Sequence, residues 1–216
     1  MLSMKSVIRR EMVARRNSLT HEEVMEKSAM IQKRVLELPI YQESSTIGLY
    51  ASFNNEVSTS LIFDEALKDR KQVLFPCIRR ETKDLVFFPV QGRDELELGP
   101  FGVMVPSCRN GGGSFIEEAD LLLIPGVCYD TKGGRLGYGG GFYDRSLGKV
   151  VELPFIAALA YEFQILDEVP MHQHDIRVDA IITEQRVIIC NLKTANLLTT
   201  GDTGTATGLQ NPMFLE

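Results

Sequence analysis

The 216-residue sequence lacks several features that would assign it to a specialised class of protein. Its four cysteines, Cys77, Cys108, Cys128 and Cys190, form no CxxC pair and no metal-ligand spacing, so we expect free thiols in a reducing compartment. The formal net charge of −6 at pH 7 argues against nucleic-acid binding through a basic surface. No apolar run approaches the length of roughly 20 residues that spans a bilayer, so we expect no membrane contact.

The N-terminal segment MLSMKSVIRREMVARR lacks the apolar core of a secretory signal. It is basic and carries Glu11 as its one acid, which keeps a mitochondrial transit peptide open beside the expected cytoplasmic location. Two common nucleotide motifs are also absent. Gly148-Lys149 is followed by valine rather than serine or threonine, and Gly137-x-Gly139 is followed three positions later by Phe142 instead of glycine. Finally, no Ser-His-Asp or Cys-His constellation is apparent, so a nucleophilic protein side chain is not indicated.

Apolar and turn-forming segments alternate along the chain in a way that predicts an α/β fold. The expected helices cover residues 4–17, 20–38, 56–70 and 142–147. The expected strands cover residues 45–52, 71–77, 84–90, 119–127, 155–161 and 179–190, with a long loop over 91–119. The run ADLLLIPGV (119–127) is apolar throughout, as in a strand buried on both faces. We therefore predict a mostly parallel sheet in a three-layer core, within one catalytic domain over residues 1–192.

Local signals refine two of these helices and the end of the chain. Thr20 is followed three positions later by Glu23, which predicts a capping box at the start of the second helix. Ser58 or Thr59 is expected to cap the helix over 56–70. Residues 193–216 are rich in threonine and glycine without apolar periodicity until their end, so we expect a flexible tail.

The stretch RLGYGGGFYDR (135–145) follows the apolar strand and precedes a helix. Consecutive backbone N–H groups without Cβ atoms can converge on phosphate, but the glycine spacing alone leaves a phosphate loop and a structural turn equally open. Asp144 would face the same phosphate, and Mg²⁺ between the two anions would reconcile them, with Asp179 as a second carboxylate. The alternatives are a first-turn helix acid for Asp144 and a strand-end turn residue for Asp179.

A longer stretch, LIPGVCYDTKGGRLGYGGGFYDR (123–145), resembles the signature of the 5-formyltetrahydrofolate cyclo-ligase family. The segments KSVIRREMVARR (5–16), YASFNNEVST (50–59) and VPMHQHDIRVDAIITE (169–184) are similar to further family segments, so the resemblance covers about residues 4–191. It implies a fold like that of sugar-phosphate isomerases and CoA-transferases. It also implies ATP- and Mg²⁺-dependent cyclisation of 5-formyltetrahydrofolate to 5,10-methenyltetrahydrofolate, with ADP and phosphate as products.

The resemblance also implies roles for individual residues. Lys5 and Arg9 would contact ATP, Asp144 and Asp179 would hold Mg²⁺, and Arg135 and Tyr143 would act in catalysis. The residues that would cradle the ATP phosphates are Arg135, Leu136, Gly137, Tyr138, Gly139, Gly140, Gly141, Phe142 and Tyr143. The residues that would contact the folate are Ala51, Glu56, Tyr138, Gly139, Gly140, Gly141 and Phe142.

Residue chemistry suits these roles and leaves alternatives. A carboxylate such as Glu56 can accept the ring N–H and the exocyclic amine of a pterin together, although it would also favour the N-terminus of the following helix. Lys5 and Arg9 are four positions apart on one helical face, which suits an ATP clamp, a solvated face or a targeting peptide. We expect Arg10, Arg15 and Arg16 to be surface residues.

Two departures from the family pattern stand out. Val105 precedes Pro106 where relatives usually have an acid, and Gly140 stands where some relatives have lysine. The expected partners are a reduced folate and ATP, the expected oligomeric state is a monomer, and no histidine metal site is expected at His172 and His174. Two other functions stay open: a folate- or nucleotide-binding relative without catalysis, and an enzyme like the sugar-phosphate isomerases or CoA-transferases.

Overall fold

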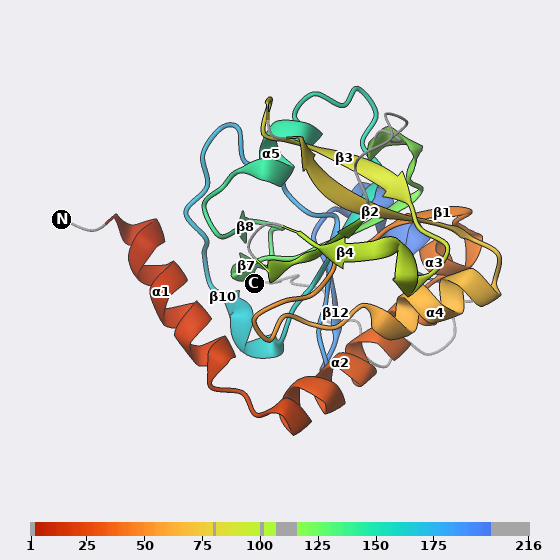
Figure 1. Cartoon of the computed structure of the whole chain (residues 1–216). Coiled ribbons are helices and arrows are strands. Elements are labelled where there is room, and N and C mark those ends of the chain that lie inside the picture. Colours follow the sequence, from red (N-terminus) through yellow and green to blue (C-terminus); the bar gives the residue numbers. More distant parts are fainter. Residues whose placement is uncertain (1–2, 80, 100–101, 107–115, 200–216) are drawn as a thin grey trace.

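The computed structural model describes residues 3–79, 81–99, 102–106 and 116–199. Its centre is a seven-stranded sheet in the order β12-β11-β9-β6-β1-β2-β3 (Figure 1). The five inner strands run parallel, and the edge strands β12 and β3 pair antiparallel with their neighbours. The strands of this sheet are β1 (Thr46–Gly48), β2 (Gln72–Arg79), β3 (Asp84–Pro89), β6 (Leu121–Ile124), β9 (Phe155–Leu159), β11 (Ala180–Ile182) and β12 (Val187–Ile189). The predicted α/β fold with a mostly parallel sheet is confirmed.

Two smaller sheets and a set of helices complete the fold. The small sheets contain β10 (Ile165–Leu166), β7 (Cys128–Asp130) and β8 (Arg135–Leu136), and the hairpin β4 (Leu96–Leu98) with β5 (Met104–Pro106). The α-helices are α1 (Met4–Asn17), α2 (His21–Leu36), α3 (Pro39–Glu43), α4 (Ser60–Lys68) and α5 (Phe142–Leu147). The short 3-10 helices are η1 (Arg93–Glu95), η3 (Ile116–Glu118), η4 (Glu162–Gln164) and η5 (Leu192–Leu197).

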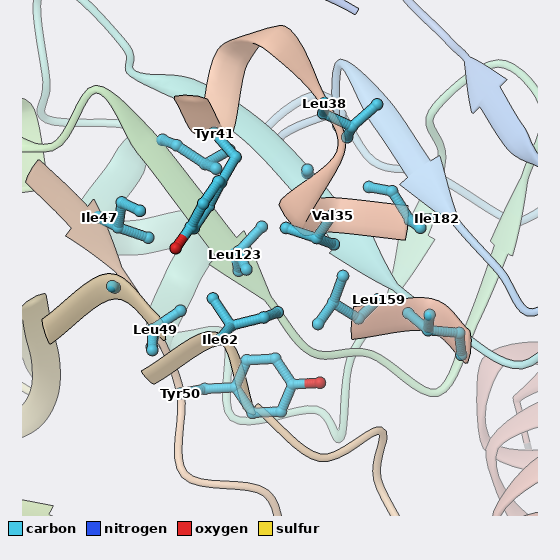
Figure 2. Packing of buried hydrophobic residues seen from close by; sticks show 14 of the residues in the cluster. Val35, Leu38, Tyr41, Ile47, Leu49, Tyr50, Ile62, Leu123, Leu159 and Ile182 are labelled. Atoms are coloured by element: carbon cyan, nitrogen blue, oxygen red, sulfur yellow. The ribbon is translucent and has the colours of Figure 1, made fainter. Parts of the chain in front are cut away.

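Both faces of the central sheet are covered, which explains the continuous apolar run in β6. Leu121 and Leu123 pack into one core cluster, and Leu122 and Ile124 pack into a second one. Successive side chains of a strand point to opposite faces, so the two clusters lie on opposite sides of the sheet. Figure 2 shows the first cluster, in which side chains from α2, α3 and α4 meet those of β1, β6, β9 and β11.

Polar side chains accept free N–H groups at the starts of α1, α2 and α4. Thr20 and Glu23 form the predicted capping box, with Thr20 N–H donating to Glu23 Oε2 at 2.8 Å and Glu23 N–H donating to Thr20 Oγ1 at 3.2 Å. Helix α4 begins later than predicted, at Ser60, and its N-cap residue makes no side-chain cap bond. Instead, Gln32 from α2 accepts the N–H of Leu61 at 2.8 Å, so a tertiary contact replaces the expected local cap.

Helix α1 lies at one side of the domain, next to the sheet of β10, β7 and β8 (Figure 1). Its buried side chain Met12 packs with Val127, Cys128, Leu136 and Val169, which belong to that small sheet and its neighbouring loops. The helix therefore docks on the polypeptide that leads into the glycine-rich loop. This docking sets which residues of α1 can reach that loop.

Some sequence predictions need correction. The run 179–190 contains two antiparallel strands, β11 and β12, joined by a turn in which Thr183 N–H donates to Arg186 O. The expected loop over 91–119 contains the hairpin of β4 and β5, while its residues 100–101 and 107–115 lie outside the described ranges. Cys77 is disulfide-bonded, contrary to expectation, whereas Cys128 and Cys190 are free thiols and Cys108 is not described.

The described chain continues past the predicted domain boundary at residue 192. The η5 turn covers Leu192–Leu197, and Leu198 is buried against the first core cluster. The remainder of the predicted tail, residues 200–216, lies outside the described residues. Among the helices of the described ranges, none has the length and apolarity that crossing a bilayer requires.

Candidate active site

A cavity of about 1550 Å³ opens at the carboxyl ends of the parallel strands. Tyr50 and Ala51 after β1, Arg79 at the end of β2 and Pro125 after β6 contribute to its wall, and the hairpin of β4 and β5 covers another side. This is the edge at which open α/β sheets bind ligands. The cavity is lined by every predicted site residue except Asp179: Lys5, Arg9, Ala51, Glu56, Arg135, Leu136, Gly137, Tyr138, Gly139, Gly140, Gly141, Phe142, Tyr143 and Asp144.

The glycine-rich loop connects β8 to α5, and its glycines are required either by a positive φ angle or by lack of space for a side chain. Gly139 and Gly141 have φ angles of +104° and +62°, which residues with a Cβ atom rarely adopt. At Gly140 a Cβ atom would lie 2.5 Å from the Phe142 ring, so Phe142 occupies the space of the missing side chain. The glycines therefore permit a backbone conformation that other residues rarely adopt, in a loop that lines the cavity.

Arg135 of β8 connects the start of the glycine-rich loop to α5. Its side chain is almost fully buried, and its Nη2 donates to Asp144 Oδ1 at 2.9 Å. Its Nη1 donates to Pro125 O at 3.4 Å, and the guanidinium lies 5.6 Å from the centre of the Tyr143 ring. Burial raises the pKa of Tyr143 well above its ordinary value, so the phenol stays neutral at physiological pH. Arg135 Nε has no hydrogen-bond partner among the described residues, which leaves a buried donor at the cavity.

Helix α1 brings Lys5 and Arg9 to the cavity, as their spacing predicts. Lys5 Nζ forms an ion pair with Asp175 Oδ2 at 2.8 Å. Arg9 Nε donates to Gly137 O at 2.7 Å, and its guanidinium lies beside Gly139, where a Cβ atom would be 3.4 Å from Arg9 Cζ. Two cations of one helical face thus line the cavity, and Arg9 contacts the glycine loop.

Glu56 also lines the cavity and is 4% exposed. Its Oε2 accepts the N–H of Phe53 at 3.2 Å, whereas its buried Oε1 has no hydrogen-bond partner within the described residues. Burial raises the pKa of Glu56 to about 7, and the Arg16 guanidinium and the Phe53 N–H counteract part of that shift. A buried carboxylate oxygen without a donor is unfavourable in an isolated chain, and therefore indicates a place for a ligand donor.

Asp179 lies elsewhere. It precedes β11, at the amino ends of the parallel strands, and lines a separate pocket of about 920 Å³. Its Oδ2 accepts the N–H of Ile156 at 2.9 Å, and its Oδ1 accepts from Asn191 Nδ2 at 2.7 Å. The structure therefore does not bring the two predicted metal ligands to one cavity. Asp179 instead makes the contacts of a turn residue at the end of a strand, which was the alternative for this residue. In the described ranges, no group of three or more His, Cys, Asp and Glu side chains is placed to hold a metal ion.

Comparison with known proteins resolves which family has this arrangement. The model of the 5-formyltetrahydrofolate cyclo-ligase family matches residues 2–184. The chain belongs to this family. The cyclo-ligase of Mus musculus is 30% identical over 195 residues, which cover 84% of this chain and 94% of the mouse protein. The cyclo-ligase of Haemophilus influenzae is 31% identical over 171 residues, covering 78% of this chain and 91% of the relative. The protein is thus an enzyme of the cyclo-ligase class.

Solved structures support the same placement. The NMR structure of Aquifex aeolicus 5,10-methenyltetrahydrofolate synthetase superposes on this cyclo-ligase with a TM-score of 0.77, at 31% identity, covering 87% of this chain and 93% of that one. A 5,10-methenyltetrahydrofolate synthetase from Mycoplasma pneumoniae shares the fold, with a TM-score of 0.68 at 22% identity, covering 84% and 99% of the two chains.

One residue beside Glu56 contradicts the sequence prediction. Arg16, expected at the surface, is 1% exposed, and its Nη1 lies 3.7 Å from Glu56 Oε1. Its spacing from Arg9 is the signal that was available, because seven positions are two helical turns and place both residues on one face of α1. The sequence could not show that this face turns towards Glu56.

Proposed function

We propose that this cyclo-ligase uses ATP and Mg²⁺ to convert 5-formyltetrahydrofolate to 5,10-methenyltetrahydrofolate, releasing ADP and phosphate, in the cavity at the carboxyl ends of the strands. The observation that carries the proposal is the buried, unpartnered Glu56 Oε1, which lines the same cavity as the glycine loop and Arg135. One cavity thus offers an acceptor for a pterin and donors for a phosphate chain. Both are needed because the reaction transfers a phosphoryl group from ATP to the folate.

The folate half is assigned to Glu56 and its neighbours. The pterin presents a ring N–H beside an exocyclic amine, and a carboxylate accepts both in a fork of charge-assisted hydrogen bonds. Ala51, Tyr138 and Phe142 line the surrounding wall. The rings of Phe53 and Tyr138 are 5.2 Å apart between centroids, so they form an aromatic surface against which a pterin can pack.

The ATP half is assigned to α1 and the glycine loop. Lys5, Arg9 and Arg135 line the cavity and would supply positive charge for the phosphates. The backbone N–H groups near Gly139 and Gly141 add neutral donors, because no Cβ atom blocks the approach there. Phosphoryl transfer depends mainly on such positioning and charge neutralisation, which explains the absence of a protein nucleophile in the sequence.

Asp144 suits a Mg²⁺ ion better than Asp179 does. Asp144 lines the cavity with a side chain that is 25% exposed, and no group of the described residues donates to its Oδ2. Both oxygens of Asp179 accept hydrogen bonds beside the other pocket, so as a direct ligand it remains a prediction of the family resemblance alone. A bound Mg²⁺ would neutralise phosphate charge in this region.

The protein groups suit the two steps of the reaction. The formyl oxygen attacks the γ-phosphorus, the bond from this phosphorus to the bridging oxygen breaks, and ADP leaves. The formyl oxygen carries no proton, so this step needs no general base. Arg135, whose Nε has no partner, is placed to stabilise the charge on the transferred phosphoryl group, and Tyr143 supports the guanidinium through its ring. The substrate's N10 then attacks the activated carbon, phosphate leaves with the formyl oxygen, and N10 releases its proton. Ring closure within one bound molecule is favoured by proximity.

The test is an absorbance assay with purified protein, 5-formyltetrahydrofolate, Mg²⁺ and ATP. We expect an ATP-dependent rise in the near-ultraviolet absorbance of the methenyl product. Binding of both substrates without this rise would favour the non-catalytic relative, and turnover of a sugar phosphate or CoA ester without ATP would favour the isomerase- or transferase-like alternative.

The Asp144→Asn substitution tests the metal assignment. It keeps the size of the side chain but removes the charge that would hold Mg²⁺, so we expect the Mg²⁺ concentration for half-maximal rate to rise and kcat to fall. Asp179→Asn is the matched comparison, and its effect is expected mainly on the melting temperature because its oxygens brace loops. Wild-type Mg²⁺ dependence in Asp144→Asn would remove Asp144 from the metal site.

A further inference from the structure

The Arg16 side chain joins three separate segments of the cavity wall. Its Nε donates to Asn54 O at 2.9 Å, in the loop that carries Glu56, and its Nη1 donates to Gly126 O at 3.4 Å, in the loop after β6. Its Nη2 donates to the hydroxyl of Tyr138, in the glycine loop. The same guanidinium lies 5.3 Å from the centre of the Tyr138 ring. One side chain of α1 therefore connects the loop that carries Glu56 to the loop after β6 and to Tyr138.

Burying this cation requires compensation, because an isolated charge in the protein interior is strongly unfavourable. Glu56 supplies it, at 3.7 Å between Nη1 and Oε1, with both side chains 2% exposed. This separation is too long for a hydrogen bond, so the pairing neutralises charge without occupying the lone pairs of Oε1. Arg16 thus favours the charged form of Glu56 and leaves its acceptor oxygen available.

The loop between Phe53 and Glu56 needs external support. Asn54 and Asn55 both have positive φ angles, +48° and +57°, which cost backbone energy in residues with a Cβ atom. Besides the bond from Arg16 to Asn54, Asn55 Nδ2 donates to Arg16 O at 3.3 Å and to Leu19 O at 3.1 Å. The end of α1 thus holds a strained loop in the conformation that points Glu56 into the cavity.

We propose that Arg16 is a positioning residue for the cyclo-ligase reaction: it holds the loop that carries Glu56 and places a positive charge beside the carboxylate that would bind the pterin. The inference deepens the proposed function and rests on the assignment of folate to Glu56. It assigns Arg16 no contact with ATP, unlike Lys5 and Arg9 of the same helix.

The charges around Glu56 make this role measurable through pH. Arg16 of α1 is the cation that counteracts the effect of burial on the pKa of Glu56. The other titratable groups coupled to Glu56 are buried tyrosines with raised pKa values, so they stay neutral near pH 7: Tyr50, Tyr129, Tyr143 and Tyr161. Removing Arg16 therefore raises the pKa of Glu56 further. The acid limb of folate binding, the pH range in which protonation of Glu56 weakens binding, then moves to higher pH.

The experiment compares Arg16→Met, Arg16→Lys and the neighbouring Arg15→Met in the absorbance assay, with KM for each substrate and kcat measured across pH. Arg16→Met is expected to raise the KM for 5-formyltetrahydrofolate roughly tenfold to a hundredfold, as for loss of charge-assisted hydrogen bonds. Its KM for ATP should stay near the wild-type value. Arg16→Lys keeps the positive charge, so its acid limb is expected to match that of the wild type. Its folate KM is expected to rise, because lysine lacks the several guanidinium N–H donors that bond Asn54, Gly126 and Tyr138.

The control separates this role from general damage to the helix. Arg15 stacks over the Phe163 ring at 4.6 Å, outside the cavity, so Arg15→Met should retain both KM values and the pH profile. Wild-type folate KM and an unshifted acid limb in Arg16→Met would overturn the proposal. If Arg16→Met does not fold, Arg16→Lys decides: an unchanged folate KM would contradict the positioning role.

Glu56→Gln distinguishes failure of this inference from failure of the proposed function. A wild-type folate KM in Glu56→Gln would refute the folate assignment, and the inference with it. A raised folate KM in Glu56→Gln beside normal Arg16 variants would refute the inference alone. In the Glu56→Gln background, Arg16→Met should no longer shift the acid limb, because the titrating group is gone.

Discussion

Glu56 makes the stability of this cyclo-ligase depend on pH in a direction that the structure specifies. The carboxyl is buried, and its pKa rises from 4.5 to about 7 because burial disfavours the charged form more than Arg16 and the Phe53 N–H favour it. A glutamine at this position has nearly the same shape but no titration in this range. Comparing Glu56→Gln with the wild-type protein therefore isolates the contribution of one ionisation.

The sign follows from proton binding. The folded state holds the Glu56 proton more tightly than the unfolded chain, so wild-type stability is lost as pH rises from the unfolded pKa near 4.5 through the folded pKa near 7. One pKa unit corresponds to about 1.4 kcal/mol, so this shift lowers the free energy of unfolding by about 3 kcal/mol between about pH 4 and about pH 8. Glu56→Gln lacks this pH dependence because glutamine stays neutral, and the attraction between Arg16 and the charged Glu56 is already included in the folded pKa of Glu56.

The assay is urea denaturation of both proteins, followed by circular dichroism at several pH values between those limits. The free energy of unfolding of Glu56→Gln, minus that of the wild type, is expected to rise by about 3 kcal/mol from the acid to the basic end. All other titrating groups occur in both proteins and cancel in the difference. Equal m-values would show that the comparison concerns the same transition. A difference that stays flat across pH, or that falls, would refute the buried-carboxylate reasoning.

Two further substitutions test separate parts of the structure. Thr20→Ala removes the capping box of α2 and is expected to lower the free energy of unfolding by about 1 kcal/mol, or the melting temperature by about 2–4 °C, with kcat and both KM values unchanged; an unchanged melting temperature would contradict the capping role. Gly139→Ala places a Cβ atom at a φ angle of +104° beside Arg9 and is expected to raise the KM for ATP roughly tenfold, since backbone strain of this kind costs about 1–3 kcal/mol. Normal ATP kinetics in Gly139→Ala would show that the loop conformation does not serve phosphate binding.

The parts of the fold that the sequence predicted are those that local chemistry determines. The capping box of Thr20 and Glu23 needs only neighbouring residues, and the run through β6 is apolar because both faces of one strand are covered. The residues of the glycine loop converge because they are consecutive. Lys5 and Arg9 line the cavity together because helical periodicity places them on one face.

The parts that the sequence did not predict depend on contacts between distant segments. Gln32 caps α4 from another helix, and Arg16 is buried because α1 docks with that face against the cavity wall. Asp179 has the residue type of a metal ligand, but strand direction places it at the amino edge of the sheet, away from Asp144. Residue type thus identified candidates for the site, and the topology of the sheet decided which of them meet.

The sheet order also explains why a single arginine can reach three parts of the cavity. β1 pairs directly with β6, although more than 70 residues separate them, so the loops that leave their carboxyl ends are neighbours. Asn54 follows β1 and Gly126 follows β6, and both present carbonyl oxygens to Arg16. The parallel pairing therefore creates the gap that the guanidinium bridges, while α1 supplies the cation from outside the sheet. Lys5 and Arg9 belong to the same helix as Arg16. The packing of α1 on the domain therefore positions both the proposed ATP contacts and the arginine that holds the Glu56 loop.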